Sequence, residues 1–305
     1  MTPGARGRFA LVLLLAAVYA VCYLAIKAGL AFAPPLRFAA FRALGGGAAL
    51  LPVILLSGGP FLPPRRQWPW LAVIAATGTV LAYGAMFLSP GRTGAGLAAV
   101  LGNTTPLVII VLAAAVLGER ITLPKAAALS LGLLGVMLTA SPAFASPGRS
   151  SLLGNALPLL AAGGTATESV LVKRIGLGRD ILRFTAWQLL VGGGSLLLVS
   201  AWLERGLAIA WTARFIGLLS FLALVGTAFA TTLWYWLLQR DEVGRLSLAL
   251  FLAPVTGLLL AVALFGERLR PAELLGVAVT VSGIGVVLLG SPRPARDRPP
   301  SGQAW

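Results

Sequence analysis

Apolar runs of about twenty residues recur along the whole chain, separated by short segments that carry charges, prolines or glycines. A helix of about this length crosses the roughly 30 Å hydrocarbon core of a bilayer. The chain is 58% hydrophobic and 11% charged, with a mean hydropathy of +0.92, whereas about a quarter of the residues in a soluble domain are charged. We therefore expect an all-α membrane protein without a sizeable soluble domain.

Charged residues, prolines and glycines divide the apolar sequence into ten candidate transmembrane helices. The basic segment that follows them, residues 292–305, is expected to be a disordered cytoplasmic tail. The ten expected helices cover residues 9–30, 36–57, 68–88, 95–117, 123–141, 152–172, 181–202, 213–238, 246–266 and 271–290.

The net charge of +15 does not indicate a nucleic-acid partner, because the basic residues lie singly or in pairs between the apolar runs rather than on one face of a domain. With both termini in the cytoplasm, 15 of the 24 lysines and arginines fall on inner segments, as the positive-inside rule favours. We therefore expect a multi-pass protein of the bacterial cytoplasmic (inner) membrane with both termini cytoplasmic.

The second half of the sequence repeats the first. The segment NTTPLVIIVLAAAVLGER at 103–120 matches FLAPVTGLLLAVALFGER at 251–268, a spacing of 148 residues. The segment LRFAAFRALGGG at 36–47 matches LRFTAWQLLVGG at 182–193, a spacing of 146 residues. The chain is therefore expected to contain two copies of one helical unit.

The two expected units, residues 1–142 and 143–291, hold five helices each. Because five is odd, the second unit is expected to enter the membrane in the opposite orientation. Many carriers use such inverted repeats, since two similar halves can exchange conformations and open a central site to each side in turn. Duplication that only built a large helical bundle is the alternative interpretation.

A proline-centred fourth helix that ends in Gly-Glu-Arg in both copies, with Lys27, Pro35 and Arg42 near the first turn, resembles the EamA branch of the drug/metabolite transporter superfamily. The resemblance covers about residues 9–291. It implies ten helices, a central cavity walled by both repeats, and export or uptake of small polar metabolites. One departure is Tyr19, where members of the family often carry tryptophan.

Polar side chains recur on matching faces of the two halves. In the first helix they share one face between Tyr19 and Lys27, and the sixth helix holds polar residues at the equivalent positions from Thr165 to Lys173. Lipid-facing positions have no reason to repeat polarity, whereas a shared cavity does; bonding between helices is the alternative. The expected substrate-binding residues are Tyr19, Tyr23, Lys27, Arg42, Tyr83, Asn103, Thr104, Glu168, Ser169, Thr227, Thr231, Trp234 and Phe251.

Glu168 is the only acidic residue well inside an expected helix, and a charge in hydrocarbon is costly enough to indicate function. Because a low-dielectric cavity disfavours the charged carboxylate, Glu168 is also the expected proton-coupling residue. Arg42 lies about two turns into the second helix, where a guanidinium suits a carboxylate or phosphate on a substrate. As alternatives, Glu168 could pair with Arg42 or Lys173, and Lys27 could extend to the membrane surface.

Pro106 and Pro254 occupy equivalent places and are expected to kink their helices, because proline has no N–H to donate to the carbonyl one turn earlier. Asn103 and Thr104 lie beside the first kink and can bind that carbonyl or the substrate. Matching kinks suit the hinges of a gate, and static kinks are the alternative. Glu119, at the end of the fourth helix, is expected to bind the N-terminus of the next helix.

These features predict an integral membrane carrier that moves a small polar metabolite, such as an amino acid or a related amphiphile, by alternating access, with export as the expected direction. The expected partners are a small-molecule substrate, the lipid bilayer and, as a candidate coupling ion, protons. We expect no cofactor, metal or nucleic acid, and either a monomer or a homodimer. A lipid or lipid-linked substrate flippase of the same fold is the alternative. A membrane-embedded enzyme is disfavoured, since no histidine, Asp-rich pair or Ser–Lys dyad appears at a suitable spacing.

Overall fold

The structure, a computed structural model, describes residues 5–90, 92, 95–144, 152–265 and 270–290. Every regular element in these ranges is a helix, which confirms the all-α class. The expected Gly-Glu-Arg ending at 266–268 and the tail at 292–305 lie outside the described residues. The elements are α1 (Ala5–Gly29), α2 (Pro35–Leu56), η1 (Arg65–Gln67), α3 (Trp68–Ile74), η2 (Ala75–Leu81), α4 (Ala82–Leu88), α5 (Ala95–Gly102), α6 (Thr105–Leu117), α7 (Leu123–Phe144), α8 (Leu152–Ile175), η3 (Gly178–Asp180), α9 (Ile181–Leu203), α10 (Ala213–Ala223), η4 (Leu224–Phe229), α11 (Ala230–Leu238), α12 (Val243–Leu248), η5 (Ala249–Phe251), α13 (Leu252–Phe265) and α14 (Pro271–Gly290).

Seven helical stretches among the described residues are long and apolar enough to cross a membrane, and two shorter helices, Val243–Leu259 and Pro271–Val286, are also apolar. The chain is therefore a multi-pass membrane protein, while the count of ten spans stays a prediction. The seven stretches are Ala10–Gly29, Pro35–Leu56, Arg65–Leu88, Val100–Leu117, Leu123–Ser141, Gly178–Leu203 and Ala213–Leu238.

Several expected helices are interrupted in the structure. The helix expected over 95–117 is divided into α5 and α6 at Asn103 and Thr104. The helix expected over 246–266 begins earlier, at Val243, and passes through the 3₁₀ turn η5 before α13. The interruptions place non-helical backbone groups inside the bundle, where they need partners from side chains or from a ligand.

The π-helical segments η2 and η4 occupy equivalent places in the two halves. Each contains a glycine that faces a side chain of the opposite half: Gly78 lies against Glu168 of α8, and Gly226 lies against Cys22 of α1. Such π turns are rare and often mark functional sites. Here the glycines bring the backbone of one half directly against the polar side chains of the other.

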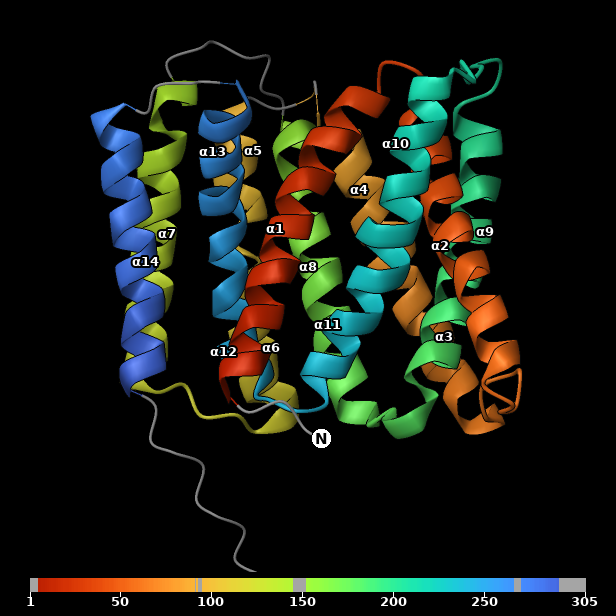
Figure 1. The fold of residues 1–305 in the computed structure, drawn as a ribbon, viewed down its shortest axis with the longest axis horizontal. Coiled ribbons are helices and arrows are strands. Elements are labelled where there is room, and N and C mark those ends of the chain that lie inside the picture. The colour runs from red at the N-terminus through yellow and green to blue at the C-terminus, as the bar shows by residue number, and fades with distance from the viewer. Residues whose placement is uncertain (1–4, 91, 93–94, 145–151, 266–269, 291–305) are drawn as a thin grey trace, which may run out of the picture.

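Equivalent helices of the two halves run in opposite directions (Figure 1). α1 begins at the lower end of the view, whereas α8 begins at the upper end. Contacts follow the repeat, because α2 packs on its equivalent α9 and α7 packs on α14, while α1 packs on α13 and α8 on α6. The pattern is unchanged when the halves are exchanged, so the two-repeat arrangement expected from the sequence fits.

Glycines allow α2 and α9 to approach closely where the halves meet. A Cβ on Gly47 would lie 2.8 Å from Cγ of Leu190, and a Cβ on Gly193 would lie 3.0 Å from Cγ of Leu44. The two contacts are repeat equivalents of each other. Small residues in membrane helices commonly permit such packing, and here they set the separation of the two helices that border the polar interior.

Candidate functional site

A cavity of about 420 Å³ lies between α1, α4, α5, α8 and α13, and it takes lining residues from both halves of the chain. Helices α4, α5 and α13 lie mainly in the upper half of the bundle in Figure 1, so the cavity lies toward that end. Its polar lining includes three tyrosines, an asparagine, a serine and two threonines: Tyr19, Tyr23, Tyr83, Asn103, Ser89, Thr105 and Thr165.

Five of the expected binding and hinge residues line this cavity: Tyr19, Tyr23, Tyr83, Asn103 and Pro254. Tyr19 and Tyr23 share the face of α1 that their spacing predicts. Other lining residues, including Met86, Ser89 and Pro158, were not expected. Thr165 could have been included, because it is the repeat equivalent of Tyr19.

Arg42 is buried on α2, with 3% of its surface exposed. Its Nε donates to Oγ1 of Thr227 at 2.7 Å, and its Nη2 donates to the carbonyl of Gly226 at 3.0 Å. The guanidinium lies 4.8 Å from the ring centre of Tyr83. The remaining nitrogen, Nη1, is buried and has no hydrogen-bond partner among the described residues. One donor group of Arg42 is therefore available beside a wall residue of the cavity.

Gln188 is the repeat equivalent of Arg42 and makes the equivalent bond. Its Nε2 donates to Oγ1 of Thr79 at 2.6 Å, as Arg42 donates to Thr227. The threonines sit in η2 and η4, directly after the glycines of these segments. The hydrogen bond to the threonine is thus present in both halves. Only the first half carries a cation at this position.

Glu168 is buried on α8 and accepts a hydrogen bond at Oε1 from the hydroxyl of Tyr235. Its carboxylate packs on η2, where a Cβ added to Gly78 would lie 2.3 Å from Oε2. The equivalent residue, Cys22, packs on Gly226 in the same way, with its Sγ 2.4 Å from an added Cβ. The second half therefore carries a carboxyl group where the first half carries a thiol.

Neither Arg42 nor Glu168 forms an ion pair among the described residues. The alternative partner Lys173 instead donates to the backbone carbonyl of Asp241 at 2.9 Å. Both charges lie within electrostatic range of Tyr19 and Tyr83. The two tyrosines that line the cavity therefore lie near both a cation and a carboxyl group.

Other expected binding residues are engaged within the protein. The indole N–H of Trp234 donates to Oγ of Ser169 at 3.0 Å, and this hydroxyl donates to the carbonyl of Thr165 at 2.8 Å. Thr231 lies beside the hydroxyl group of Tyr83. These contacts match the interpretation in which hydroxyl groups bond one helix to another.

Phe251 and Lys27 are two of the nine expected binding residues that lie outside the cavity lining. Phe251 is fully buried in η5 and packs on α7, where a Cβ added to Gly132 would lie 2.4 Å from its ring. Lys27 is exposed near the end of α1, where a long cationic side chain reaches the surface without penalty.

The break between α5 and α6 is stabilised by local side chains. Oγ1 of Thr104 donates to the carbonyl of Leu101 at 2.6 Å, and Oγ1 of Thr105 donates to the carbonyl of Gly102 at 2.8 Å. Pro106 falls in the first turn of α6, where its missing N–H costs nothing. The carbonyl that Pro106 leaves without a donor, that of Gly102, is thus bound by a threonine side chain. The threonine is Thr105, whereas the sequence led us to expect Thr104.

A family model for EamA-like transporters matches the chain twice, at residues 8–141 and 152–289. YvbV of Bacillus subtilis, an uncharacterized transporter, is 31% identical over 261 residues, which are 86% of this chain and 85% of that protein. A probable amino-acid metabolite efflux pump of Salmonella typhimurium is 27% identical over 292 residues, which are 92% and 94% of the two chains.

A solved crystal structure has the same fold, with a TM-score of 0.78 and 21% sequence identity, over 92% of this chain and 94% of that chain. The sequence resemblance, the two family matches and the shared fold all extend over most of the protein. The chain therefore belongs to the EamA-like transporter family of the drug/metabolite transporter superfamily, and it is a membrane transporter.

Proposed function

We propose that this transporter is a secondary carrier for a small amphiphilic metabolite that bears an amine and a carboxylate, such as an amino acid, and that it exports this substrate by alternating access. In this proposal ten helices cross the bacterial cytoplasmic membrane as two inverted units, 1–142 and 143–291, with both termini cytoplasmic. The Salmonella relative is named as a probable amino-acid metabolite efflux pump, which supports this class of substrate.

The observation that carries the proposal is the free Nη1 of Arg42, buried next to Tyr83 of the cavity wall. A buried donor without an acceptor is unfavourable, and a carboxylate is the acceptor that a guanidinium binds best, often through two parallel bonds. A rotation of the Tyr83 ring would join the guanidinium to the cavity. A substrate carboxylate would then satisfy the donor.

Glu168 supplies the opposite charge for the substrate amine. Its carboxyl group is held by Tyr235 and by the backbone at Gly78, and no cation faces it among the described residues. A substrate ammonium would compensate a buried carboxylate, and a proton would do the same when the site is empty. This exchange is the proposed coupling step, with Tyr19 and Tyr23 enclosing the apolar part of the substrate.

A ligand-stabilisation screen of the purified protein tests this proposal. Amino acids, organic acids, nucleosides and cationic drugs are compared for their effect on thermal unfolding, since a ligand that binds the folded state raises its stability. We expect stabilisation by zwitterionic amphiphiles, with loss of the effect in Arg42→Gln. Stabilisation by neutral nucleosides or by cations alone would contradict the proposed substrate class.

A flippase is the second candidate, because an apolar groove of about 510 Å³ lies on the outside of the bundle between α1, α2, α9 and α11. An acyl chain could occupy such a groove. The groove and the polar cavity share no lining residue, so a head group in the cavity would not be continuous with a chain in the groove. Retention of a lipid in the cavity during purification, seen by native mass spectrometry, would favour the flippase.

A further inference from the structure

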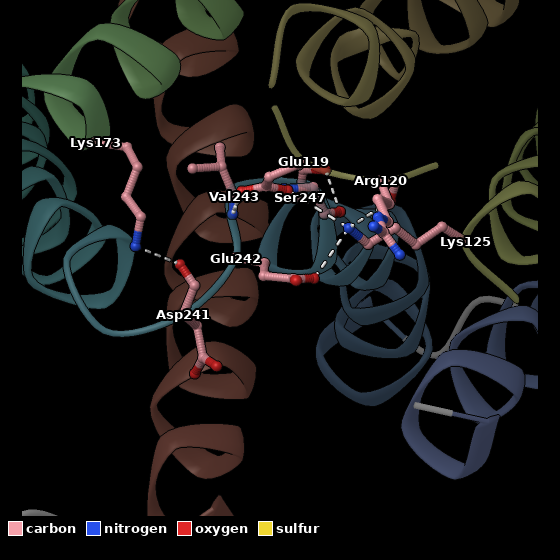
Figure 2. Close-up of polar contacts among 9 residues, drawn as sticks. Glu119, Arg120, Lys125, Lys173, Asp241, Glu242, Val243 and Ser247 are labelled. Atoms are coloured by element: carbon pink, nitrogen blue, oxygen red, sulfur yellow. Dashed lines mark hydrogen bonds and ion pairs between the residues drawn. The ribbon is translucent and has the colours of Figure 1, made fainter. Parts of the chain in front are cut away.

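The end of the bundle opposite the cavity is tied together by a polar cluster (Figure 2). We define the α6–α12 clasp as Glu119, Lys125, Glu242, Val243 and Gly244. These residues lie after α6, at the start of α7, and at the start of α12. Helices α6 and α12 lie in the lower half of the bundle in Figure 1, near the N-terminus.

Glu119 binds the start of α12 with both carboxylate oxygens. Oε1 accepts from the backbone N–H of Val243 at 2.8 Å, and Oε2 accepts from that of Gly244 at 3.0 Å. The chain leaves α6 through Gly118, whose φ of 70° is the left-handed conformation that glycine adopts freely. The expected tie to the next helix, α7, is limited to the contact with Lys125 in its first turn, because both backbone bonds of Glu119 go to a helix of the other half.

Lys125 forms ion pairs with both glutamates of the clasp. Its Nζ lies 2.9 Å from Oε2 of Glu242 and 3.5 Å from Oε2 of Glu119, and it donates to the carbonyl of Arg120 at 3.2 Å. The side chains of Lys125 and Glu119 are 8% and 12% exposed, so this pair is largely shielded from water, whereas Glu242 is 60% exposed. The clasp is therefore centred on Glu119.

Two further contacts tie the same loop to other helices. Lys173 at the end of α8 donates to the carbonyl of Asp241 at 2.9 Å, and Nε of Arg8 on α1 lies 3.1 Å from Oδ2 of Asp241. The loop before α12 is thus joined to α1, α6 and α8. Any separation of α12 from α6 at this end must first release Glu119.

We propose that the α6–α12 clasp is the lock of the cytoplasmic gate, and that Glu119 must release α12 before the cavity can open to the cytoplasm. This inference rests on the proposed alternating access and orientation. The bonds suit a reversible lock, because the first N–H groups of a helix have no partner within it and can be taken over by water when the carboxylate withdraws.

The chain contains a matched control at the opposite end. Glu204 accepts from the backbone N–H groups of Leu36 and Arg37 at 2.8 and 2.9 Å, and so binds the start of α2 as Glu119 binds the start of α12. Glu204→Gln removes the same chemistry, and it should lower stability similarly. It should not open the cytoplasmic end.

Accessibility of a buried reporter on α12 tests the lock without depending on transport. Ser247 is fully buried, and its hydroxyl donates to the carbonyl of Gly244 at 2.8 Å, so Ser247→Cys with Cys22→Ala gives a single, near-isosteric thiol. Its reaction with an impermeant maleimide is measured in inside-out vesicles. We expect Glu119→Gln to raise the labelling rate at least about tenfold, and Glu204→Gln to leave it unchanged.

Equal labelling in the Glu119→Gln and reference proteins would overturn the proposal, as would the same increase in both glutamate variants. If Glu119→Gln does not fold, Gly244→Ala decides the matter, because its Cβ would lie 3.1 Å from Oε2 of Glu119 and displaces the carboxylate. That variant should raise labelling by a smaller factor, and unchanged labelling would reject the lock. Failure of transport in the unmodified protein would reject the proposed function without affecting this readout.

Discussion

Arg42 and Gln188 are related by the internal repeat, and each donates a hydrogen bond to the threonine that follows the glycine of a π segment in the opposite half. The bond lengths, 2.7 and 2.6 Å, are nearly the same. The geometry is therefore that of a common scaffold, and at this position the halves differ in the charge of one side chain.

Arg42→Gln makes the two halves alike at this position. Glutamine can keep the bond to Thr227 but has no charge, so we expect the uptake of carboxylate-bearing substrates into proteoliposomes to fall at least about tenfold. Neutral compounds should be affected less. Arg205→Gln, which removes an exposed cation, is the control and should transport normally. Equal losses for charged and neutral substrates would argue against recognition by the guanidinium.

Glu168→Gln removes a titrating group and keeps an acceptor for the hydroxyl of Tyr235. We expect the pH dependence of transport to become flat, because glutamine resembles the protonated acid at every pH. Tyr235→Phe is the control, since it retains the carboxyl group and should move the pH profile without abolishing it. A Glu168→Gln protein with the original profile would exclude Glu168 as the coupling group.

Gly226→Ala is expected to destabilise the protein by about 1–3 kcal/mol, the usual cost of overpacking, because its Cβ would lie 2.4 Å from Sγ of Cys22. Removal of the sulfur in Gly226→Ala/Cys22→Ala should recover most of the loss. Gly217→Ala, which meets nothing within 4 Å, should be neutral. Thermal unfolding in detergent measures all three, and no recovery in the double variant would mean that the clash lies elsewhere.

Pro106→Ala restores an N–H that can bind the carbonyl of Gly102, so α5 and α6 can join into a longer helix. We expect the variant to shift the balance between inward-open and outward-open states. Labelling of Tyr23→Cys, at the cavity wall, reports the shift. Unchanged labelling together with unchanged transport would show that the break at 103–104 is a static feature.

The proposed topology predicts opposite accessibility for two exposed arginines. Arg120 follows α6 and Arg205 follows α9, at opposite ends of the bundle in Figure 1. An impermeant thiol reagent added to intact cells should label Arg205→Cys and spare Arg120→Cys. Labelling of both from outside is incompatible with the inverted arrangement.

Periodicity identified the polar faces correctly but not the depth of each side chain. The spacing of Tyr19 and Tyr23 placed both on the cavity wall, because a helical face follows directly from the sequence period. Phe251, the repeat equivalent of Asn103, was also expected to bind substrate, yet it packs on α7. The backbone at the two breaks is alike, because the N–H of Thr104 binds the carbonyl of Leu101 as that of Leu252 binds the carbonyl of Ala249. The two positions therefore differ in the fate of the side chain, which sequence equivalence does not give.

The π segments could not be predicted from the sequence. A π turn lacks the regular hydrogen bonds of an α-helix. Here it is accompanied by a contact between residues that are distant in sequence, Gly78 and Glu168. The composition of η2 is ordinary for a membrane helix, and its conformation depends on this tertiary contact. The cross-half role of Glu119 was missed for the same reason, since its partners, Val243 and Gly244, are distant in sequence.

The exchange symmetry of the fold has a thermodynamic consequence. If both halves had one sequence, the inward-open and outward-open forms would be the same molecule viewed from opposite sides, and their free energies in a symmetric bilayer would be equal. Any resting preference must therefore come from positions where the halves differ, such as Glu168 opposite Cys22. Pairs of positions at which the halves differ, and not the shared helical framework, therefore determine which of the two states the empty protein prefers.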